Sequence, residues 1–206
     1  KKNRYKIYVN INKKKKYFYS NSFFENDLKN LLATITIISI FKDVHQLDKN
    51  IFYGHKATNG RGDIQKLRLF KKNFYLVDES YNSNPLSLKS ALKNFDMIKI
   101  NNSKKHLVIG DMLELGKYSK KLHTEAGNSI NKTSLKNVNV IGKHVKWLFN
   151  SLDKKKRGII MKNKSQIIDL IKSRLNNNDY LMIKGSNTTG LNSLTNQIKS
   201  GKINAL

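Results

Sequence analysis

FYLVDESYNSNPLSLKSALKNF, residues 74–95, is the stretch that decides the fold of this chain. Its first residues form an apolar, aromatic and β-branched run that is typical of a buried strand. Pro85, the only proline among the 206 residues, stands where a helix would begin, a position at which its missing N–H costs nothing. Asn84 before it suits an N-cap. The stretch therefore predicts a strand, a polar turn and a helix from residue 85 onward.

The predicted helix has one apolar face. Its members are Leu86, Leu88, Ala91, Leu92 and Phe95. The polar turn before the helix, residues 78–82, then lies at the carboxyl end of a strand. Open α/β sheets place their ligands at such strand ends. We therefore interpret this turn as part of a binding site.

Apolar strands alternate with amphipathic helices along the rest of the chain. Strands are predicted at residues 74–78, 106–110, 137–141, 158–161 and 180–184, and helices at 85–97, 119–132, 143–151, 165–175 and 190–199. This alternation indicates a mainly parallel sheet with helices on both faces and right-handed crossovers. The fold class is therefore α/β, a Rossmann-like domain.

Glycines and polar residues follow several of the predicted strands. Gly110, Gly142 and Gly185 each come at or just after a strand end. Glycine allows the backbone to approach a ligand, and the helix N-termini that follow favour anions. We expect these turns to lie along one carboxyl edge together with residues 78–82.

The first 60 residues have a different pattern. Residues 5–11 and 17–24 alternate apolar and polar side chains around a basic turn, which predicts a hairpin. A helix is expected from about residue 26 to 42, apolar enough to be buried in a larger domain. Residues 43–60 are interpreted as a connector. Because the chain starts with Lys1 and its first residues resemble mid-domain strands, we expect a fragment of a longer protein.

The formal net charge of +26 would ordinarily suggest nucleic acid as a partner. The lysines are scattered over predicted loops and exposed helix faces, and only residues 13–16 form a run. Lys, Asn and Ile share A/T-rich codons, so a biased genome explains their abundance without selection for a nucleic-acid surface. We therefore expect no nucleic-acid partner.

Several kinds of chemistry are excluded by what the sequence lacks. The chain has no cysteine, so disulfides, thiolate zinc sites and cysteine nucleophiles are ruled out. No signal peptide is visible, and the longest apolar stretch, residues 31–41, is too short to span a bilayer. We expect a cytoplasmic protein without a membrane partner. No G-x-x-x-x-G-K-[ST] loop occurs, so the chain alone is not expected to hold ATP and magnesium.

Four stretches resemble, in the right order, motifs of the bacterial Mur ligase family. They are NGRGD (residues 59–63), DESYNSNP (78–85), VIGDMLELG with His123 (108–116), and IKGSN (183–187). NDLKNLLA, residues 26–33, also resembles a segment late in the family's central domain. The resemblance implies that residues 1–60 are the remnant of a central ATP-binding domain and that residues 61–206 are the C-terminal Rossmann-like domain.

The residues of these motifs are similar to those of the Mur ligase family members that add D-Ala-D-Ala to UDP-MurNAc-tripeptide. In that family ATP phosphorylates the terminal carboxylate, and the incoming amine then displaces phosphate to form the amide. The family's phosphate loop, Mg²⁺ ligands and carbamylated lysine lie upstream, in sequence not present here. The resemblance thus implies an ATP- and Mg²⁺-dependent ligase with small-molecule substrates, inactive as this fragment alone. We expect the protein to be a monomer.

The resemblance also assigns roles to nucleotide-binding residues. Asn30 matches the family's contact to the nucleotide base, although residues 26 and 27 depart from the motif. Arg61 matches an arginine that reaches the ATP phosphates, and its planar fork suits bidentate bonds to phosphate oxygens. Asp78 and Tyr81 would contact the adenosine, and Asn82 would support the turn or the nucleotide.

On the substrate side the resemblance implicates Lys184 and Ser186, with the lysine neutralising a carboxylate. Asn187 stands where the family often has Arg. Three further motif residues are interpreted as mainly structural, as caps and loop hydrogen-bond partners: Asp111, Glu114 and His123.

Other functions remain open at this point. The chain could belong to another Mur ligase or to a folylpolyglutamate-type ligase. It could also be a Rossmann-like binding or regulatory module without catalysis, or a basic nucleic-acid-binding protein. A preceding segment with a phosphate loop would favour the ligase.

Overall fold

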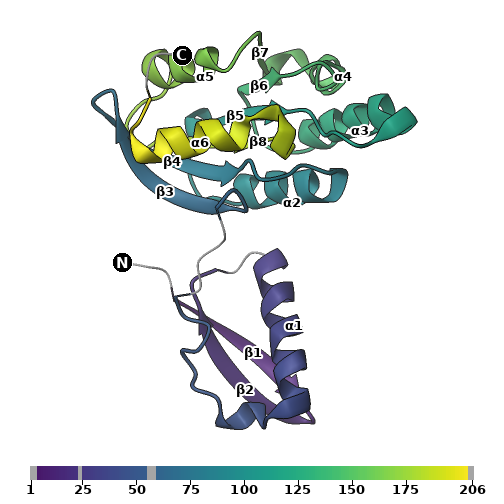
Figure 1. Cartoon of the computed structure of the whole chain (residues 1–206), viewed down its shortest axis with the longest axis vertical. Helices are drawn as coiled ribbons and strands as arrows, with labels where there is room; N and C mark the ends of the chain where they lie inside the picture. The colour runs from purple at the N-terminus through teal and green to yellow at the C-terminus, as the bar shows by residue number, and fades with distance from the viewer. Residues whose placement is uncertain (1–3, 23–24, 55–58, 204–206) are drawn as a thin grey trace. The chain divides into compact units, whose positions relative to one another are not determined.

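The computed structural model describes residues 4–22, 25–54 and 59–203. The chain divides into two compact units, Lys1–Lys56 and Ala57–Leu206 (Figure 1). The assignment of the first unit to a central ATP-binding domain stays a prediction.

The first unit is a hairpin covered by one helix. Strands β1 (Tyr5–Ile11) and β2 (Lys14–Ser20) pair antiparallel, and helix α1 spans Glu25–Phe41. The hairpin was predicted, but β2 begins earlier than residue 17. Two residues with positive φ, Asn12 and Lys13, make the whole turn, so the basic run continues into the strand.

Helix α1 covers the hairpin with one face only. Leu31 and Ile35 are buried in a small core with Val9 and Phe18. Other apolar residues of the helix are largely exposed: Leu32, Ile37, Ile40 and Phe41. Within the described residues, no helix combines the length and the apolar character needed to cross a membrane.

The second unit is built on one six-stranded sheet in the order β3-β4-β8-β5-β6-β7. The strands are β3 (Asp63–Leu69), β4 (Lys72–Glu79), β5 (Lys105–Gly110), β6 (Val138–Ile141), β7 (Arg157–Met161) and β8 (Tyr180–Lys184). All neighbouring pairs are parallel except β3 with β4, which is antiparallel. The predicted α/β, Rossmann-like, mainly parallel sheet is confirmed.

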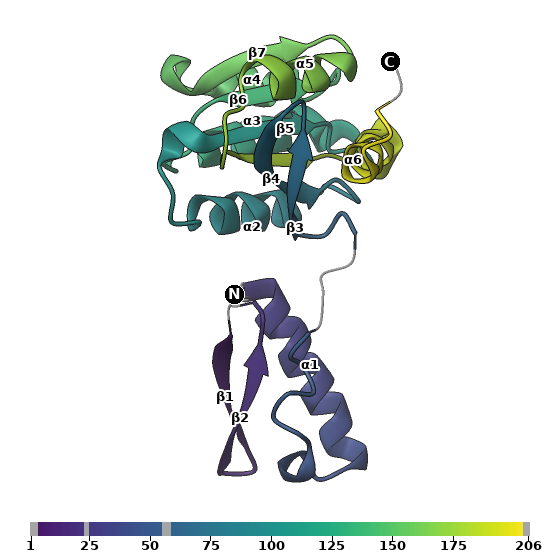
Figure 2. The ribbon, with the colours of Figure 1, turned by 90° about the vertical axis from the view of Figure 1, so that its left-hand side faces the viewer.

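Helices cover both faces of this sheet (Figures 1 and 2). The helices are α2 (Pro85–Asp96), α3 (Ser119–Asn131), α4 (Lys146–Ser151), α5 (Ser165–Ser173) and α6 (Leu191–Ser200). Buried residues of α2, α3 and α4 form one core with alternate strand residues, and those of α5 and α6 form a second core with the others. Since both faces are covered, a central strand such as β5 is buried along its whole length.

Short 3-10 turns connect these elements. They are η1 (Val44–Gln46), η2 (Asn102–Lys104), η3 (Gly116–Tyr118), η4 (Lys154–Lys156) and η5 (Asn187–Thr189).

The start of α2 agrees with the sequence. Asn84 is the N-cap and Pro85 the first helical residue; the Asn84 side chain accepts from the Ser87 N–H at 2.8 Å, and the Ser87 hydroxyl accepts from the Asn84 N–H at 3.0 Å. This reciprocal capping box satisfies two otherwise unpaired donors.

One residue of the predicted apolar face of α2 was assigned wrongly. Leu88, Leu92 and Phe95 are buried, but Leu86 is 81% exposed. The buried residues follow the helical spacing of three and four, and Leu86, two positions before Leu88, therefore falls on the opposite side.

Candidate functional site

The carboxyl ends of the three central strands lie level with one another. In the register of the sheet, Lys184 of β8 pairs with Glu79 of β4 on one side and with Ile109 of β5 on the other. At Gly110 a Cβ atom would lie 3.4 Å from the Cα of Gly185. The turns after these strands therefore gather on one edge, as the sequence predicted.

Two predicted nucleotide-binding residues lie side by side at this edge. The guanidinium carbon of Arg61 is 4.5 Å from the centroid of the Tyr81 ring, and both side chains are exposed. The Tyr81 N–H donates to the carbonyl oxygen of Gly60 at 3.0 Å. Gly60 has φ +77°, and a Cβ there would lie 2.8 Å from the Cβ of Tyr81, so the close approach requires glycine. The pair offers a ligand a planar cation and an aromatic ring.

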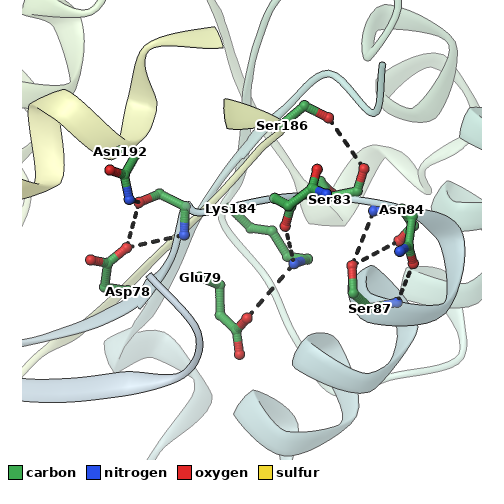
Figure 3. A network of polar contacts seen from close by, with 10 residues as sticks. Asp78, Glu79, Ser83, Asn84, Ser87, Lys184, Ser186 and Asn192 are labelled. Carbon is green, nitrogen blue, oxygen red and sulfur yellow. Dashed lines mark hydrogen bonds and ion pairs between the residues drawn. The ribbon is translucent and has the colours of Figure 1, made fainter. Parts of the chain in front are cut away.

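Asp78 is fully buried, unlike this exposed pair. Its Oδ1 accepts from the Ser80 N–H at 3.0 Å and from the Ser80 hydroxyl at 2.5 Å (Figure 3). Its Oδ2 lies 2.6 Å from Lys199 Nζ. Because the side chain is fully buried, the predicted contact with the adenosine would require the turn to open, and that contact stays a prediction. In this structure the carboxylate holds the turn.

Lys184 reaches under the same turn. It is 1% exposed, its Nζ donates to the Asn82 carbonyl oxygen at 3.0 Å, and Glu79 Oε2 lies 3.7 Å away (Figure 3). Burial lowers the pKa of Lys184, while the Glu79 carboxylate acts in the opposite direction. The Asn82 side chain is exposed and accepts from the Ser83 N–H at 2.7 Å.

The Ser186 side chain connects the turn after β8 with the turns after β4 and β5. Its hydroxyl donates to the Ser83 carbonyl oxygen at 3.2 Å (Figure 3). The same hydroxyl accepts from the Leu113 N–H at 2.9 Å. The side chain is buried, while Asn187 after it is exposed. The predicted contacts of Lys184 and Ser186 with a substrate stay predictions.

The structural role predicted for Asp111 is confirmed. Its carboxylate accepts from the backbone N–H groups of Lys143, His144 and Val145 at 3.0, 2.9 and 2.6 Å. These bonds hold the turn after β6, and they explain why α4 begins at Lys146 rather than at the predicted residue 143.

The structural role predicted for His123 is confirmed as well. The ring is fully buried; Nε2 accepts from the Met112 N–H at 3.1 Å, and Nδ1 bonds the Ser119 carbonyl oxygen at 2.8 Å. This pattern requires the neutral ring with its proton on Nδ1. Burial lowers the pKa of His123, which agrees with a neutral ring. Glu114 is exposed with φ +63°.

Asn30 lies exposed on α1, in the first unit. Its carbonyl oxygen accepts from the Thr34 hydroxyl at 2.9 Å. Its predicted contact with the nucleotide base stays a prediction. Across the described part of the chain, no cluster of three or more His, Asp or Glu side chains is placed to hold a metal ion.

Sequence reasoning missed the residues that support the turn from behind. Lys199, Thr195 and Asn192 of α6 all contact Asp78 or Ser80. Lys199 is one of 40 basic residues, so its type carried no signal. The signal that could have found it is the spacing of these three polar residues, three and four positions apart, which places them on one side of α6.

The comparison with protein families agrees with this geometry. The family model for the Mur ligase, glutamate ligase domain matches residues 65–187. The chain therefore belongs to the Mur ligase family.

Curated relatives carry a more particular name. The UDP-N-acetylmuramoyl-tripeptide–D-alanyl-D-alanine ligase of Rickettsia prowazekii is 29% identical over 163 residues, which is 79% of this chain and 34% of the relative. The ligase of the same name from Buchnera aphidicola subsp. Acyrthosiphon pisum is 32% identical over 128 residues, 59% of this chain and 26% of the relative. The chain thus spans about a third or less of the length of these relatives.

Solved structures show the same fold. The MurF ligase of Thermotoga maritima, in complex with ADP, matches with a TM-score of 0.75 at 20% identity and covers 96% of this chain and 43% of that one. MurF from Acinetobacter baumannii matches with a TM-score of 0.76 at 17% identity, covering 96% and 42%.

Proposed function

We propose that this chain is the C-terminal part of an ATP-dependent carboxylate–amine ligase that adds D-Ala-D-Ala to UDP-MurNAc-tripeptide in peptidoglycan precursor synthesis. The observation that carries the proposal is the match over 79% of the chain to a curated ligase with this name. The turns that carry the motifs lie together at one carboxyl edge of the sheet, and this arrangement supports the proposal.

The proposed reaction has two steps. An oxygen of the tripeptide carboxylate attacks the γ-phosphorus of ATP, ADP leaves, and an acyl phosphate forms. The amine of D-Ala-D-Ala then attacks the acyl carbon, phosphate leaves, the amide forms and the amine loses a proton. Phosphoryl transfer depends mainly on positioning and charge neutralisation, which a domain that supplies extra contacts can provide.

The residues of the carboxyl edge fit this division of work. The exposed guanidinium of Arg61 suits the nucleotide phosphates, and the Tyr81 ring beside it suits the base. Asn82 would support the turn or the nucleotide, and Asp78 would contact the adenosine. Lys184 and Ser186 would lie on the side of the peptide substrates, and Asn30 would contact the nucleotide base.

Magnesium and the triphosphate need a phosphate loop, which does not occur in these 206 residues, and metal ligands, for which the described residues offer no cluster of three or more His, Asp or Glu side chains. We therefore expect the chain alone to be inactive. We also propose a monomeric, cytoplasmic protein that acts on small molecules and binds neither membranes nor nucleic acid. The positive charge of the chain would still attract oligonucleotides weakly. This binding should disappear when the salt concentration is raised from about 50 to about 200 mM, because phosphate contacts lose orders of magnitude in affinity over that range.

A chimaeric enzyme tests the function. In this chimaera our chain replaces the segment of the Rickettsia prowazekii relative that it matches, and the N-terminal part of that relative precedes it. We expect phosphate release from ATP that requires both UDP-MurNAc-tripeptide and D-Ala-D-Ala. A well-folded chimaera that binds ATP but forms no amide would instead favour a non-catalytic binding module.

A further inference from the structure

Helix α6 presents three polar side chains to the turn that carries Tyr81. The Thr195 hydroxyl lies 2.9 Å from the Ser80 hydroxyl, and Asn192 Nδ2 donates to the same oxygen at 3.3 Å. Thr195 and Ser80 are both fully buried. Lys199, further along α6, lies beside two carboxylates.

Lys199 joins this helix to two strands at once. Its Nζ lies 3.1 Å from Asp63 Oδ2 and 2.6 Å from Asp78 Oδ2. Asp63 of β3 and Asp78 of β4 are direct partners in the antiparallel register. The Lys199 and Asp63 side chains are 10% and 18% exposed and Asp78 is not exposed at all, so solvent screens these ion pairs weakly.

The same network continues to the exposed pair Arg61 and Tyr81. Asp78 binds Ser80 through Oδ1, and its carbonyl oxygen accepts from the Gly62 N–H at 2.8 Å. Gly62 and Ser80 are the chain neighbours of Arg61 and Tyr81 respectively. Both exposed side chains are thus attached to backbone that Asp78 holds.

We propose that Lys199 is a positioning residue for nucleotide binding, which acts through Asp78 to hold the two backbone segments that present Arg61 and Tyr81. The effect of Lys199 on nucleotide binding rests on the proposed function. Its effect on the two backbone segments does not depend on that function. Asp78 is in this view the central member of a support for these two segments.

The charge balance explains why Lys199 is needed. Burial opposes the charged form of Lys199, but the neighbouring carboxylates of Asp78 and Asp63 outweigh it and raise the pKa of the lysine. Without the lysine, the buried Asp78 carboxylate would have no cation beside it, which is strongly unfavourable. The carboxylate would then move or take up a proton, and the bonds to Ser80 would loosen.

Amide hydrogen exchange on the 206-residue chain tests this directly. The N–H groups of Gly62 and Tyr81, which donate to Asp78 and Gly60, report on the two segments. In Lys199→Met we expect both to exchange at least tenfold faster, with Lys199→Arg restoring most of the protection. Unchanged exchange of both amides in Lys199→Met would overturn the proposal.

The matched control is Lys156→Met. Lys156 is also buried, and its Nζ donates to the Leu135 carbonyl oxygen at 3.0 Å, but it precedes β7 at the opposite edge of the sheet. This variant should leave the exchange of Gly62 and Tyr81 unchanged. Equal acceleration in both variants would indicate general destabilisation and contradict the proposal. If Lys199→Met does not fold, Lys199→Gln, which removes the charge but keeps a hydrogen-bonding side chain beside Asp63 and Asp78, replaces it with the same expected result.

The chimaeric ligase supplies the functional readout. Lys199→Met should raise the KM for ATP about tenfold while changing the KM for D-Ala-D-Ala less than about twofold. An unchanged KM for ATP beside faster exchange would contradict the link to nucleotide binding. If the unsubstituted chimaera forms no amide, the proposed function fails, and the exchange experiment still decides the role of Lys199.

Discussion

Arg61 lies over the ring of Tyr81, with its guanidinium carbon 4.5 Å from the ring centroid. The two residues flank the paired strands β3 and β4, so the hairpin brings together two motifs that the sequence separates. This contact fixes the direction in which the guanidinium is presented, and it allows a first prediction.

Arg61→Ala in the chimaeric ligase should reduce ligation strongly, by 100-fold or more on the order seen when a phosphate-stabilising group is removed. Arg61→Lys keeps the charge but loses the planar fork, so we expect it to restore only part of the activity. Steady-state rates with varied ATP check both. Near-normal turnover of Arg61→Ala would contradict the assigned role.

Asn84→Ala should destabilise the second unit by about 1 kcal/mol, because the N-cap bond to Ser87 is lost. Leu86→Ala is the matched control on the same helix, and since Leu86 is 81% exposed it should change the free energy of unfolding by less than about 0.5 kcal/mol. Urea unfolding followed by the fluorescence of Trp147, the single tryptophan, measures both. A larger decrease in the free energy of unfolding for Leu86→Ala would contradict the exposed position of Leu86 and support the apolar face predicted from the sequence.

Gly127→Ala should destabilise the packing of α3 on α4. A Cβ at Gly127 would lie 2.0 Å from Ser151 Oγ and 2.5 Å from the Leu148 carbonyl oxygen. Replacing glycine by alanine in an open helix stabilises by about 1 kcal/mol, but overpacking costs about 1–3 kcal/mol, so we expect a net loss. Asn128→Ala, exposed on the same helix, should be neutral or slightly stabilising. Stabilisation by Gly127→Ala would show that the two helices separate easily.

Stability should fall as the pH is lowered from about 7 to 5. Burial lowers the pKa values of both His106 and His123 below 6.5, although Asp179 beside His106 acts in the opposite direction. The unfolded chain therefore takes up protons in this window that the folded chain does not, and the free energy of unfolding decreases as the pH drops.

Urea midpoints at pH 7.5 and 5.5, read from Trp147, check this pH dependence. His106→Gln should make the difference between the two midpoints smaller. His45→Gln, in the first unit, should leave it unchanged. A midpoint that rises on acidification would mean that the buried rings are charged in the folded state.

The arrangement of the second unit was predictable where local signals agree. Apolar runs marked every parallel strand, and Asn84 with Pro85 marked the start of α2 to the residue. The edge strand β3 was missed because four of its seven residues, Asp63, Gln65, Lys66 and Arg68, are charged or polar and give no apolar run. Its turn to β4 also uses Phe70 and Lys71 at φ +50° and +61°, positions where Gly or Asn would have signalled a hairpin.

The site was predictable only in part for the same physical reason. Motif residues on exposed turns, such as Arg61 and Tyr81, carry their chemistry in their type and spacing. The support behind them depends on tertiary contacts between distant segments, such as Lys199 with Asp63 and Asp78, and no local pattern encodes such a triad.

Photolabelling of the chimaeric ligase with 8-azido-ATP is the most direct test of a nucleotide site on this edge. Because the Tyr81 ring is placed to pack on the base, the account predicts ATP-protectable label on the tryptic peptide of residues 73–89. Label that competes with ATP but is absent from this peptide, in an enzyme that still forms the amide, would contradict the account.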